Sequence, residues 1–334
     1  MIFGNQKLPE GTPERPLVTF ALFAYNQQEY VRDAVLGAFS QTYSPLEIVI
    51  SDDHSKDETY EIILEEASKY RGQHKVVVNR NKSNLGLIGH VNKIFEIASG
   101  ELIVAAAGDD ISLPIRTERI CSEYINRGKP LLIHTKALEM GQTGTLTGRQ
   151  LPPHYLRTKP DLARAALAQS LYLGATGAWH RSLFDKYGPI KYCHAYEDLV
   201  LGFRAVIENK IEFIDEPLIK YRTGSGLTTK NQKVSSLRTY LKRRIKGLRV
   251  SVDVQKQRLD DWIKSGVTDP AVTKLIKHSV LKYDVRLKII EHTGDIPGSM
   301  LKCPIQTLRG IASETLGLLA EAAGKRIRKL RSRP

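Results

Sequence analysis

The chain has little cysteine and no long apolar stretch. Its 334 residues include three cysteines, Cys121, Cys193 and Cys303, without CxxC spacing, so neither a disulfide framework nor a zinc site is expected. No segment approaches the roughly 20 consecutive apolar residues of a membrane-spanning helix. The opening stretch MIFGNQKLPEGTPERP also lacks the apolar region of a signal peptide. These absences predict a cytoplasmic protein without a membrane span.

Surplus charge is absent from the first two thirds of the chain. Residues 1–230 carry 27 Lys and Arg against 27 Asp and Glu, whereas residues 231–334 carry 23 against 9. The net charge of +14 therefore lies entirely in the last third. This distribution predicts an N-terminal arm (1–15), a neutral domain (16–230) and a basic helical extension (231–334), and nucleic acid is not expected as a partner.

Apolar runs alternate with segments of helical periodicity in the first third of the chain. Strands are expected at 17–23, 46–51, 76–78 and 102–107, and helices at 31–39, after a capping box of Ser55 and Glu58, and at 87–98. The strand LIVAAA (102–107) is apolar without alternation, which is typical of a strand covered on both faces. This order predicts an α/β fold with a Rossmann-like, doubly wound, mostly parallel sheet.

The remaining elements are expected to be less regular. The pattern predicts a strand at 131–133, a turn-rich loop at 141–150, a helix at 161–173, a small-residue segment at 174–180, a helix at 197–206 and a strand at 211–214. Apolar residues at helical spacing in 234–262 and 308–327 predict helices that pack on the domain, pair two copies of the chain or lie on an anionic membrane surface, with packing favoured.

Two Asp-Asp pairs follow two of the expected strands. Asp109 and Asp110 come after the strand at 102–107, and Asp52 and Asp53 come after the strand at 46–51. Ligands of open α/β sheets bind beyond the carboxyl ends of strands, and adjacent carboxylates suit Mg²⁺ or Mn²⁺. Each pair also fits a turn or helix cap. Two pairs at one edge favour a metal and diphosphate site over caps.

Six segments carry a resemblance to a known family. In chain order they are FALFAYNQQEY (20–30), EIVISDDHSKDET (47–59), NLGLIGHVNKIFEIASG (84–100), GDDIS (108–112), GATGAWHRSLFDKYG (174–188) and EDLVLGFR (197–204). The chain resembles the inverting nucleotide-sugar transferases of glycosyltransferase family 2, in particular bacterial surface-polysaccharide enzymes. The resemblance implies a GT-A catalytic domain over 16–230. The QxxRW motif of processive members is missing, so transfer of a single sugar is expected.

The resemblance also implies roles for individual residues. The residues implied in donor nucleotide binding are Ala24, Tyr25, Asn26, Asp52, Asp53, Asn84, Asp109 and Arg222. Asp110, with Asp109, would bind Mn²⁺ or Mg²⁺ as the DXD equivalent, and the metal would act as a Lewis acid toward the departing diphosphate. Many relatives carry a histidine after a Tyr-Arg pair, but Tyr221-Arg222 has none, so a third protein ligand is not assigned.

Asp198 is implied as the general base that deprotonates the acceptor hydroxyl. The start of a helix favours its ionised form, and the like charge of Glu197 opposes it. The alternative is that both acids are ordinary first-turn residues. Trp179, His180 and Glu197 would contact the acceptor, with a packed core position as the alternative for Trp179.

The donor is expected to be a nucleoside diphosphate sugar, with UDP-sugar favoured, and the acceptor a saccharide that is carried on a lipid, as in O-antigen assembly. The basic cluster at 325–334 is expected to bind an anionic membrane surface from the cytoplasmic side. A nucleotidyltransferase is a rival, but the first strand is not followed by a Gly-rich phosphate loop. A nucleic-acid or scaffold protein that uses the basic tail is the non-enzyme rival.

Overall fold

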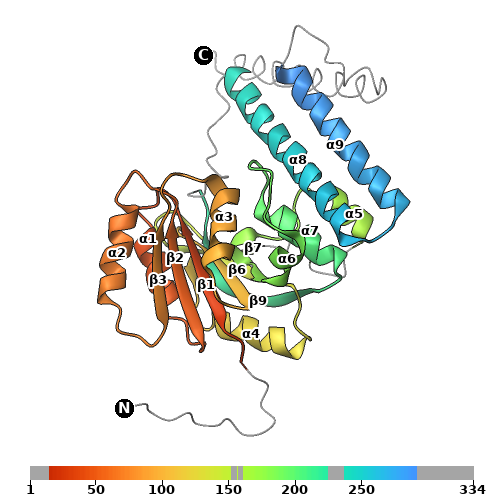
Figure 1. Ribbon diagram of the computed structural model, residues 1–334. Coiled ribbons are helices and arrows are strands. Elements are labelled where there is room, and N and C mark those ends of the chain that lie inside the picture. Colours follow the sequence, from red (N-terminus) through yellow and green to blue (C-terminus); the bar gives the residue numbers. More distant parts are fainter. Residues whose placement is uncertain (1–14, 152–155, 157–160, 225–236, 292–334) are drawn as a thin grey trace.

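A computed structural model gives the structure of the chain and describes residues 15–151, 156, 161–224 and 237–291. Helices cover a central sheet, and two long helices, α8 and α9, stand beside each other at one end (Figure 1). The strands are β1 (Val18–Ala24), β2 (Leu46–Asp52), β3 (Lys75–Arg80), β4 (Leu102–Ala107), β5 (Ile111–Ser112), β6 (Leu132–Met140), β7 (Leu146–Leu151), β8 (Ala178–His180) and β9 (Ile211–Arg222). The helices are α1 (Val31–Phe39), α2 (Thr59–Lys69), α3 (Gly86–Ile97), α4 (Arg116–Asn126), α5 (Leu162–Leu167), the 3₁₀ turn η2 (Gly174–Thr176), α6 (Ser182–Tyr187), α7 (Glu197–Ile207), α8 (Leu237–Ser265) and α9 (Pro270–Glu291).

The sheet has nine strands, in the order β3-β2-β1-β4-β8-β6-β9-β5, with β7 paired to β6. The first four strands in this order are parallel to one another, as the alternation of strands and helices predicts. The second half is mixed, because β8 runs antiparallel to both β4 and β6. The result is a doubly wound parallel half that is continued by a mixed half.

Apolar side chains on the two faces of the sheet form separate cores. Along β1, Val18, Phe20 and Leu22 pack with α1, α2 and α4, whereas Ala21 packs with α3 and α7 on the opposite face. Successive side chains of a strand point to opposite faces, so a strand with both faces covered is apolar throughout. The predicted burial of 102–107 on both faces is confirmed, since its residues divide between the same two cores.

Four of the expected elements differ from those observed. The strand expected at 131–133 continues to Met140 as β6. Residues 146–151 of the expected loop form β7, an exposed strand that carries no apolar pattern. The helix expected at 161–173 ends at Leu167, and Leu171 and Tyr172 after it are buried in the core. The strand expected at 211–214 continues to Arg222, and the pairing of β9 with β6 shifts register on both sides of Pro217.

The described part of the basic extension packs on the domain. Val254 and Trp262 of α8 share a core with α3, α5 and α7, and Val272 and Ile276 of α9 join it. None of the helices in the described ranges combines the length and apolarity that a bilayer crossing requires. The predictions for residues 1–14, for the boundary near residue 230, for the helix at 308–327 and for the cluster at 325–334 concern residues outside the described ranges.

Candidate active site

Three parallel strands end together at one edge of the sheet. Ala24 of β1 pairs with Asp52 of β2, and Phe23 of β1 pairs with Ala107 of β4. The amide of Asp53 donates to the carbonyl of Ala24 at 2.9 Å, which ties the loop after β2 to the end of β1. The two Asp-Asp pairs therefore reach the same edge, as their positions after the strands predict.

A cleft of about 340 Å³ lies at this edge, between the strand ends and the first turn of α7. Its volume is in the range of small-molecule sites. Eight of the predicted site residues line it, namely Ala24, Tyr25, Asp53, Asn84, Asp109, Asp110, Glu197 and Asp198. The other five do not, namely Asn26, Asp52, Trp179, His180 and Arg222.

Asp53 is held in the cleft wall by the loop that leads into α3. Its Oδ1 accepts hydrogen bonds from Asn81 Nδ2 at 2.8 Å and from the Leu85 amide at 2.9 Å. Its Oδ2 accepts from the Gly86 amide at 3.0 Å. Asn84 Nδ2 donates to the backbone carbonyl of Asp53 at 3.3 Å. Because each carboxylate oxygen has two acceptor positions, Asp53 can also accept from a bound ligand.

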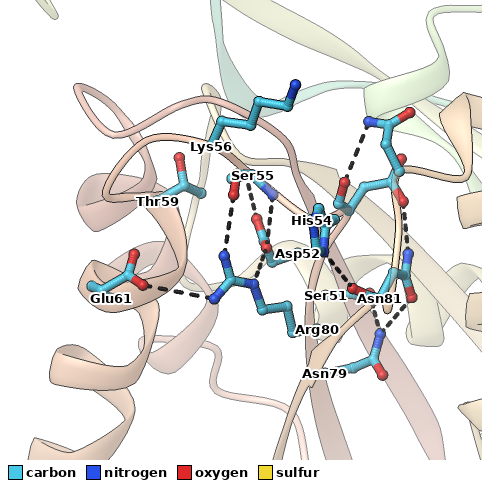
Figure 2. Close-up of polar contacts among 12 residues, drawn as sticks. Ser51, Asp52, His54, Ser55, Lys56, Thr59, Glu61, Asn79, Arg80 and Asn81 are labelled. Atoms are coloured by element: carbon cyan, nitrogen blue, oxygen red, sulfur yellow. Dashed lines mark hydrogen bonds and ion pairs between the residues drawn. The ribbon is translucent and has the colours of Figure 1, made fainter.

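Asp52 holds the loop after β2 through polar contacts (Figure 2). It is not among the residues that line the cleft. It is fully buried, and it accepts hydrogen bonds from the amide and the hydroxyl of Ser55. Arg80 Nε lies 3.5 Å from Asp52 Oδ2, and Arg80 Nη2 donates to the carbonyl of Ser55 at 3.1 Å. The predicted nucleotide contact of Asp52 is therefore not supported by its position.

The predicted capping box of Ser55 and Glu58 is wrong. The hydroxyl of Ser55 accepts a hydrogen bond from the Asn26 amide at 2.9 Å. Ser55 therefore stabilises the loop after β2 and does not cap α2. Helix α2 begins at Thr59, whose amide donates to Asp57 Oδ1 at 3.1 Å. Asn26 thus joins the loops after β1 and β2, and its own side chain is not among the cleft-lining groups.

Asp109 and Asp110 are buried beside the end of β9. Asp110 Oδ1 accepts a hydrogen bond from the Arg222 amide at 2.7 Å, while Asp110 Oδ2 is buried without a hydrogen-bond partner in the described structure. Arg222 is itself buried, and its Nε donates to the Asp109 carbonyl at 2.9 Å. Its Nη1 donates to the Gln142 carbonyl at 2.7 Å. Arg222 therefore supports the acidic pair from behind, instead of lining the cleft as predicted.

The surroundings of Asp110 favour its neutral form. Desolvation raises the pKa of Asp110 well above its ordinary value, and the charge of Asp109 raises it further. The Arg222 amide and the charges of Arg116 and Arg222 act in the opposite direction. Two carboxylates in so confined a place repel each other, and a cation would relieve that repulsion.

Glu197 and Asp198 form the first turn of α7 and are half-buried on the cleft wall. Desolvation raises the pKa of both, and the charge of Asp198 raises that of Glu197 further. The amides of Leu199 and Asp198 and the charge of Arg258 limit the rise at Asp198. Asp198 Oδ1 is buried without a hydrogen-bond partner among the described residues.

The small residues at 174–177 permit a close approach to this acidic pair. A Cβ atom on Gly174 would lie 2.3 Å from Glu197 Oε1. The backbone of η2 therefore leaves room for the first turn of α7.

Trp179 and His180 lie away from the cleft, which corrects the predicted acceptor contacts. Strand β8 runs antiparallel to β4, so it leads from the cleft toward the amino end of β4, where His180 pairs with Leu102. Trp179 is buried in the core, and its Nε1 donates to the Tyr172 hydroxyl at 2.7 Å. Of the two predicted roles for Trp179, a packed core position is therefore correct and contact with the acceptor is not.

Several cleft residues were not singled out as site residues from the sequence, among them Gln27, His90, Tyr196 and Tyr221. His90 Nε2 lies 2.7 Å from Ser51 Oγ, and desolvation lowers its pKa although the charges of Asp53 and Asp52 oppose this. His90 lies on the cleft side of α3, one turn after the start of the helix. This position in the predicted helix could have indicated that His90 lines the cleft. Burial raises the pKa of Tyr221 to about 12, so its phenol is neutral.

Comparison with known proteins assigns this site to a family. Residues 19–171, which include Asp53, Asp109 and Asp110, match the sequence profile of Glycosyl transferase family 2. An uncharacterized glycosyltransferase of Rickettsia prowazekii is 28% identical over 232 residues, which cover 67% of this chain and 69% of that protein.

Two solved structures share the fold. S. aureus TarS in complex with UDP-GlcNAc superposes with a TM-score of 0.57 at 15% identity, covering 89% of this chain and 80% of that chain. The mannosyltransferase PcManGT of Pyrobaculum calidifontis, in complex with GDP-Man and Mn²⁺, gives 0.51 at 15% identity, covering 95% and 81%. The matched profile, the relatives named as glycosyltransferases and this shared architecture support a glycosyltransferase of family 2 with a GT-A fold.

Proposed function

We propose that this protein transfers a single sugar, with inversion at the anomeric carbon, from a nucleoside diphosphate sugar to a saccharide acceptor in a metal-dependent reaction. The observation that carries the proposal is a pair of carboxylates, Asp110 and Asp198, that come from different elements and line one cleft. Each keeps one buried oxygen without a hydrogen-bond partner among the described residues. Buried polar atoms normally have hydrogen-bond or metal partners, so we infer that a bound ligand supplies the missing partner of each oxygen.

Asp110 and Asp109 fit a divalent cation. The donor set is hard oxygen, which suits Mg²⁺ or Mn²⁺, and the unpartnered Asp110 Oδ2 supplies a ligand position. A bound cation would neutralise the diphosphate and stabilise the charge that develops on it as it leaves. Arg222 keeps the pair in place through its amide and its guanidinium.

Asp198 is suited to deprotonate the acceptor hydroxyl. Inversion by direct attack requires a base on the acceptor side, and Asp198 belongs to α7, whereas the acidic pair follows β4. The start of a helix stabilises a negative charge. Burial raises the pKa of Asp198 from its ordinary value, which makes the carboxylate a stronger base than an exposed one.

Tyr25, Asp53 and Asn84 are proposed to hold the nucleoside, because they line the end of the cleft formed by β1, β2 and α3. A uridine diphosphate sugar is the first donor to test, since TarS was solved with UDP-GlcNAc, and a guanosine diphosphate sugar is the second, since PcManGT was solved with GDP-Man. Tyr196 and Tyr221 offer aromatic surface for a saccharide acceptor. We also propose that this acceptor is lipid-linked, as in surface-polysaccharide assembly.

Thermal unfolding with nucleoside diphosphates tests the proposal. A ligand at 100 times its Kd stabilises the folded state by about 2.7 kcal/mol, so one nucleoside diphosphate with Mn²⁺ is expected to raise Tm by several degrees. Asp110→Asn should lose the metal-dependent part of that rise. Asp185→Asn, which changes an exposed carboxylate away from the cleft, should keep it. An equal rise with and without Mn²⁺ in all three proteins would contradict the metal assignment.

A further inference from the structure

Arg258 of α8 is buried against the helix that carries Asp198. Its side chain is fully buried, and its Nε and Nη2 donate to the Leu199 carbonyl at 3.3 and 3.1 Å. Its Nη1 donates to the carbonyls of Ala166 and Ala168 at 3.1 and 3.0 Å. One guanidinium thus binds the first turn of α7 and the end of α5 together.

The guanidinium of Arg258 is not paired with a carboxylate through a direct ion pair among the described residues. Arg204, the other buried arginine between α7 and α8, makes a two-pronged ion pair with Asp261 at 2.8 and 3.1 Å. Within the described ranges Arg258 makes no such pair, and the carboxylate whose charge acts on it is Asp198. A buried cation without a bonded carboxylate is costly, and the negative charge of Asp198 offsets part of that cost.

Arg258 is the cation among the titratable groups that face Asp198. These groups are Glu197 on α7, Tyr172 and Tyr196 in the segments before it, Tyr221 on β9 and Arg258 on α8. Burial raises the pKa of each tyrosine, so the phenols are uncharged at neutral pH. Glu197 can only add negative charge. Arg258 is therefore the side chain of this set that favours the ionised form of Asp198.

We propose that Arg258 is a positioning residue for sugar transfer, which fixes the first turn of α7 and places a positive charge beside the carboxylate of Asp198. The proposal rests on the role of Asp198 proposed above. Arg258 does not line the cleft, so it acts through Asp198 and not on substrate. The basic extension is then part of the catalytic machinery, because α8 supplies this side chain.

The test compares neutral and charged replacements at position 258. Arg258→Met removes the charge, Arg258→Gln removes it but keeps a donor for a carbonyl, and Arg258→Lys keeps the charge without the planar fork. Gln255→Leu is the matched control, because Gln255 Nε2 donates to the same Ala166 carbonyl at 3.1 Å without carrying charge.

The primary readout is the ionisation of Asp198, followed by carboxyl ¹³C NMR of Asp-labelled protein without donor. The Asp198 signal is identified by its loss in Asp198→Asn. In Arg258→Met, or in Arg258→Gln if the Met variant does not fold, the midpoint should rise by about one pH unit. Arg258→Lys should move it less, and Gln255→Leu should leave it unchanged. The acidic limb of kcat/KM should shift in parallel, while the donor KM stays constant.

The two proposals fail in different ways. A folded neutral variant whose Asp198 midpoint equals that of the wild type overturns the role of Arg258. A shift of equal size in Gln255→Leu also overturns it, because loss of packing would then be the cause. A midpoint that moves as expected in a protein that transfers sugar from no nucleoside diphosphate sugar overturns the proposed function and leaves the effect of Arg258 on Asp198 standing.

Discussion

At the scale of single residues, the site is marked by carboxylate oxygens that the fold leaves unpaired. Asp110 Oδ2 and Asp198 Oδ1 are buried without hydrogen-bond partners among the described residues. An unsatisfied buried polar atom costs about 1–3 kcal/mol. Native proteins accept such local conflicts mainly at functional sites, and here both oxygens belong to residues of the same cleft.

Asp198→Asn and Glu197→Gln separate the two acids of α7. Burial and the charge of Asp198 raise the pKa of Glu197, so its neutral form is favoured and a glutamine imitates it. Asp198→Asn removes the proposed base and should lower kcat by at least about 10²-fold, the usual contribution of general base catalysis. Glu197→Gln should lose less than that, and donor Kd should stay the same in both. Steady-state kinetics and calorimetry check this, and equal losses of kcat would contradict the assignment of the base.

Gly174→Ala tests the close approach of η2 to α7. The new Cβ would meet Glu197 Oε1 at 2.3 Å, and this atom ends a flexible side chain that can move. The unfolding free energy should fall by less than about 1 kcal/mol, while kcat falls because Glu197 is displaced in the cleft. Gly100→Ala is the contrast, since its Cβ would lie 2.4 Å from the Thr19 amide nitrogen, which cannot move without the sheet. Urea unfolding and steady-state kinetics of both variants test this prediction. A loss of unfolding free energy that is larger in Gly174→Ala than in Gly100→Ala would contradict it.

Sequence reasoning identified the residues whose place follows from the end of a parallel strand. Asp53, Asp109 and Asp110 are examples, because the carboxyl edge of the sheet gathers them. Sequence reasoning failed where the position of a residue depends on the direction in which a side chain points or a strand runs. Asp52 and Asp53 are adjacent, and only the folded loop determines which one faces the cleft and which one holds Ser55. Trp179 was misplaced because the antiparallel course of β8 leaves no mark in the sequence.

At the scale of elements, α8 is fastened to α7 by polar contacts as well as by apolar packing. Arg204 and Asp261 are both buried, and Gln257 Nε2 donates to Asp261 Oδ1 at 2.9 Å. The guanidinium of Arg204 also donates to the Gly188 carbonyl at 2.9 Å. A network of this kind fixes the position of one helix on another, since each group has lost its water and needs its partner.

Removing one partner of this pair should be worse than removing both. Asp261→Leu leaves the buried charge of Arg204 without its carboxylate, and should lower the unfolding free energy by about 3–5 kcal/mol. The double variant Arg204→Met with Asp261→Leu should lose less, because apolar side chains replace both charges. A double-mutant cycle by urea denaturation measures the coupling. Strictly additive losses would show that the pair contributes nothing as a unit.

The parallel half of the sheet was predictable because β1, β2 and β4 are buried on both faces and the helices between the strands have clear periodicity. The other half was not, for identifiable reasons. β7 is an exposed edge strand without an apolar pattern. Pro217 lies within β9, and a proline in a sequence pattern argues against a continuous strand. Strands that depend on pairing with distant segments carry weak local signals, so the mixed half became visible only in the structure.

At the scale of the whole molecule, the surplus positive charge and the residues that line the cleft lie in different stretches of the sequence, and α8 packs one against the other. The domain up to residue 230 has equal numbers of charges of each sign, and the extension carries the whole surplus of +14. Through α8 the extension packs on α7, which carries Asp198. A basic surface fixed to the catalytic domain in this way would orient the cleft relative to an anionic surface.

Removal of residues 325–334 tests the predicted membrane contact. This segment contains six Lys and Arg and no Asp or Glu, and each basic residue near an anionic bilayer contributes about 1 kcal/mol at moderate salt. Deletion should therefore reduce sedimentation with vesicles that contain phosphatidylglycerol, and replacement of the six residues by glutamine should do the same at unchanged length. Binding to neutral phosphatidylcholine vesicles should be weak for all three proteins, and high salt should weaken binding of the full chain to anionic ones. Because residues 325–334 are predicted to bind the membrane and have no predicted role in the cleft, sugar transfer to a soluble acceptor should persist. Vesicle binding that the deletion leaves unchanged would remove the membrane role of this segment.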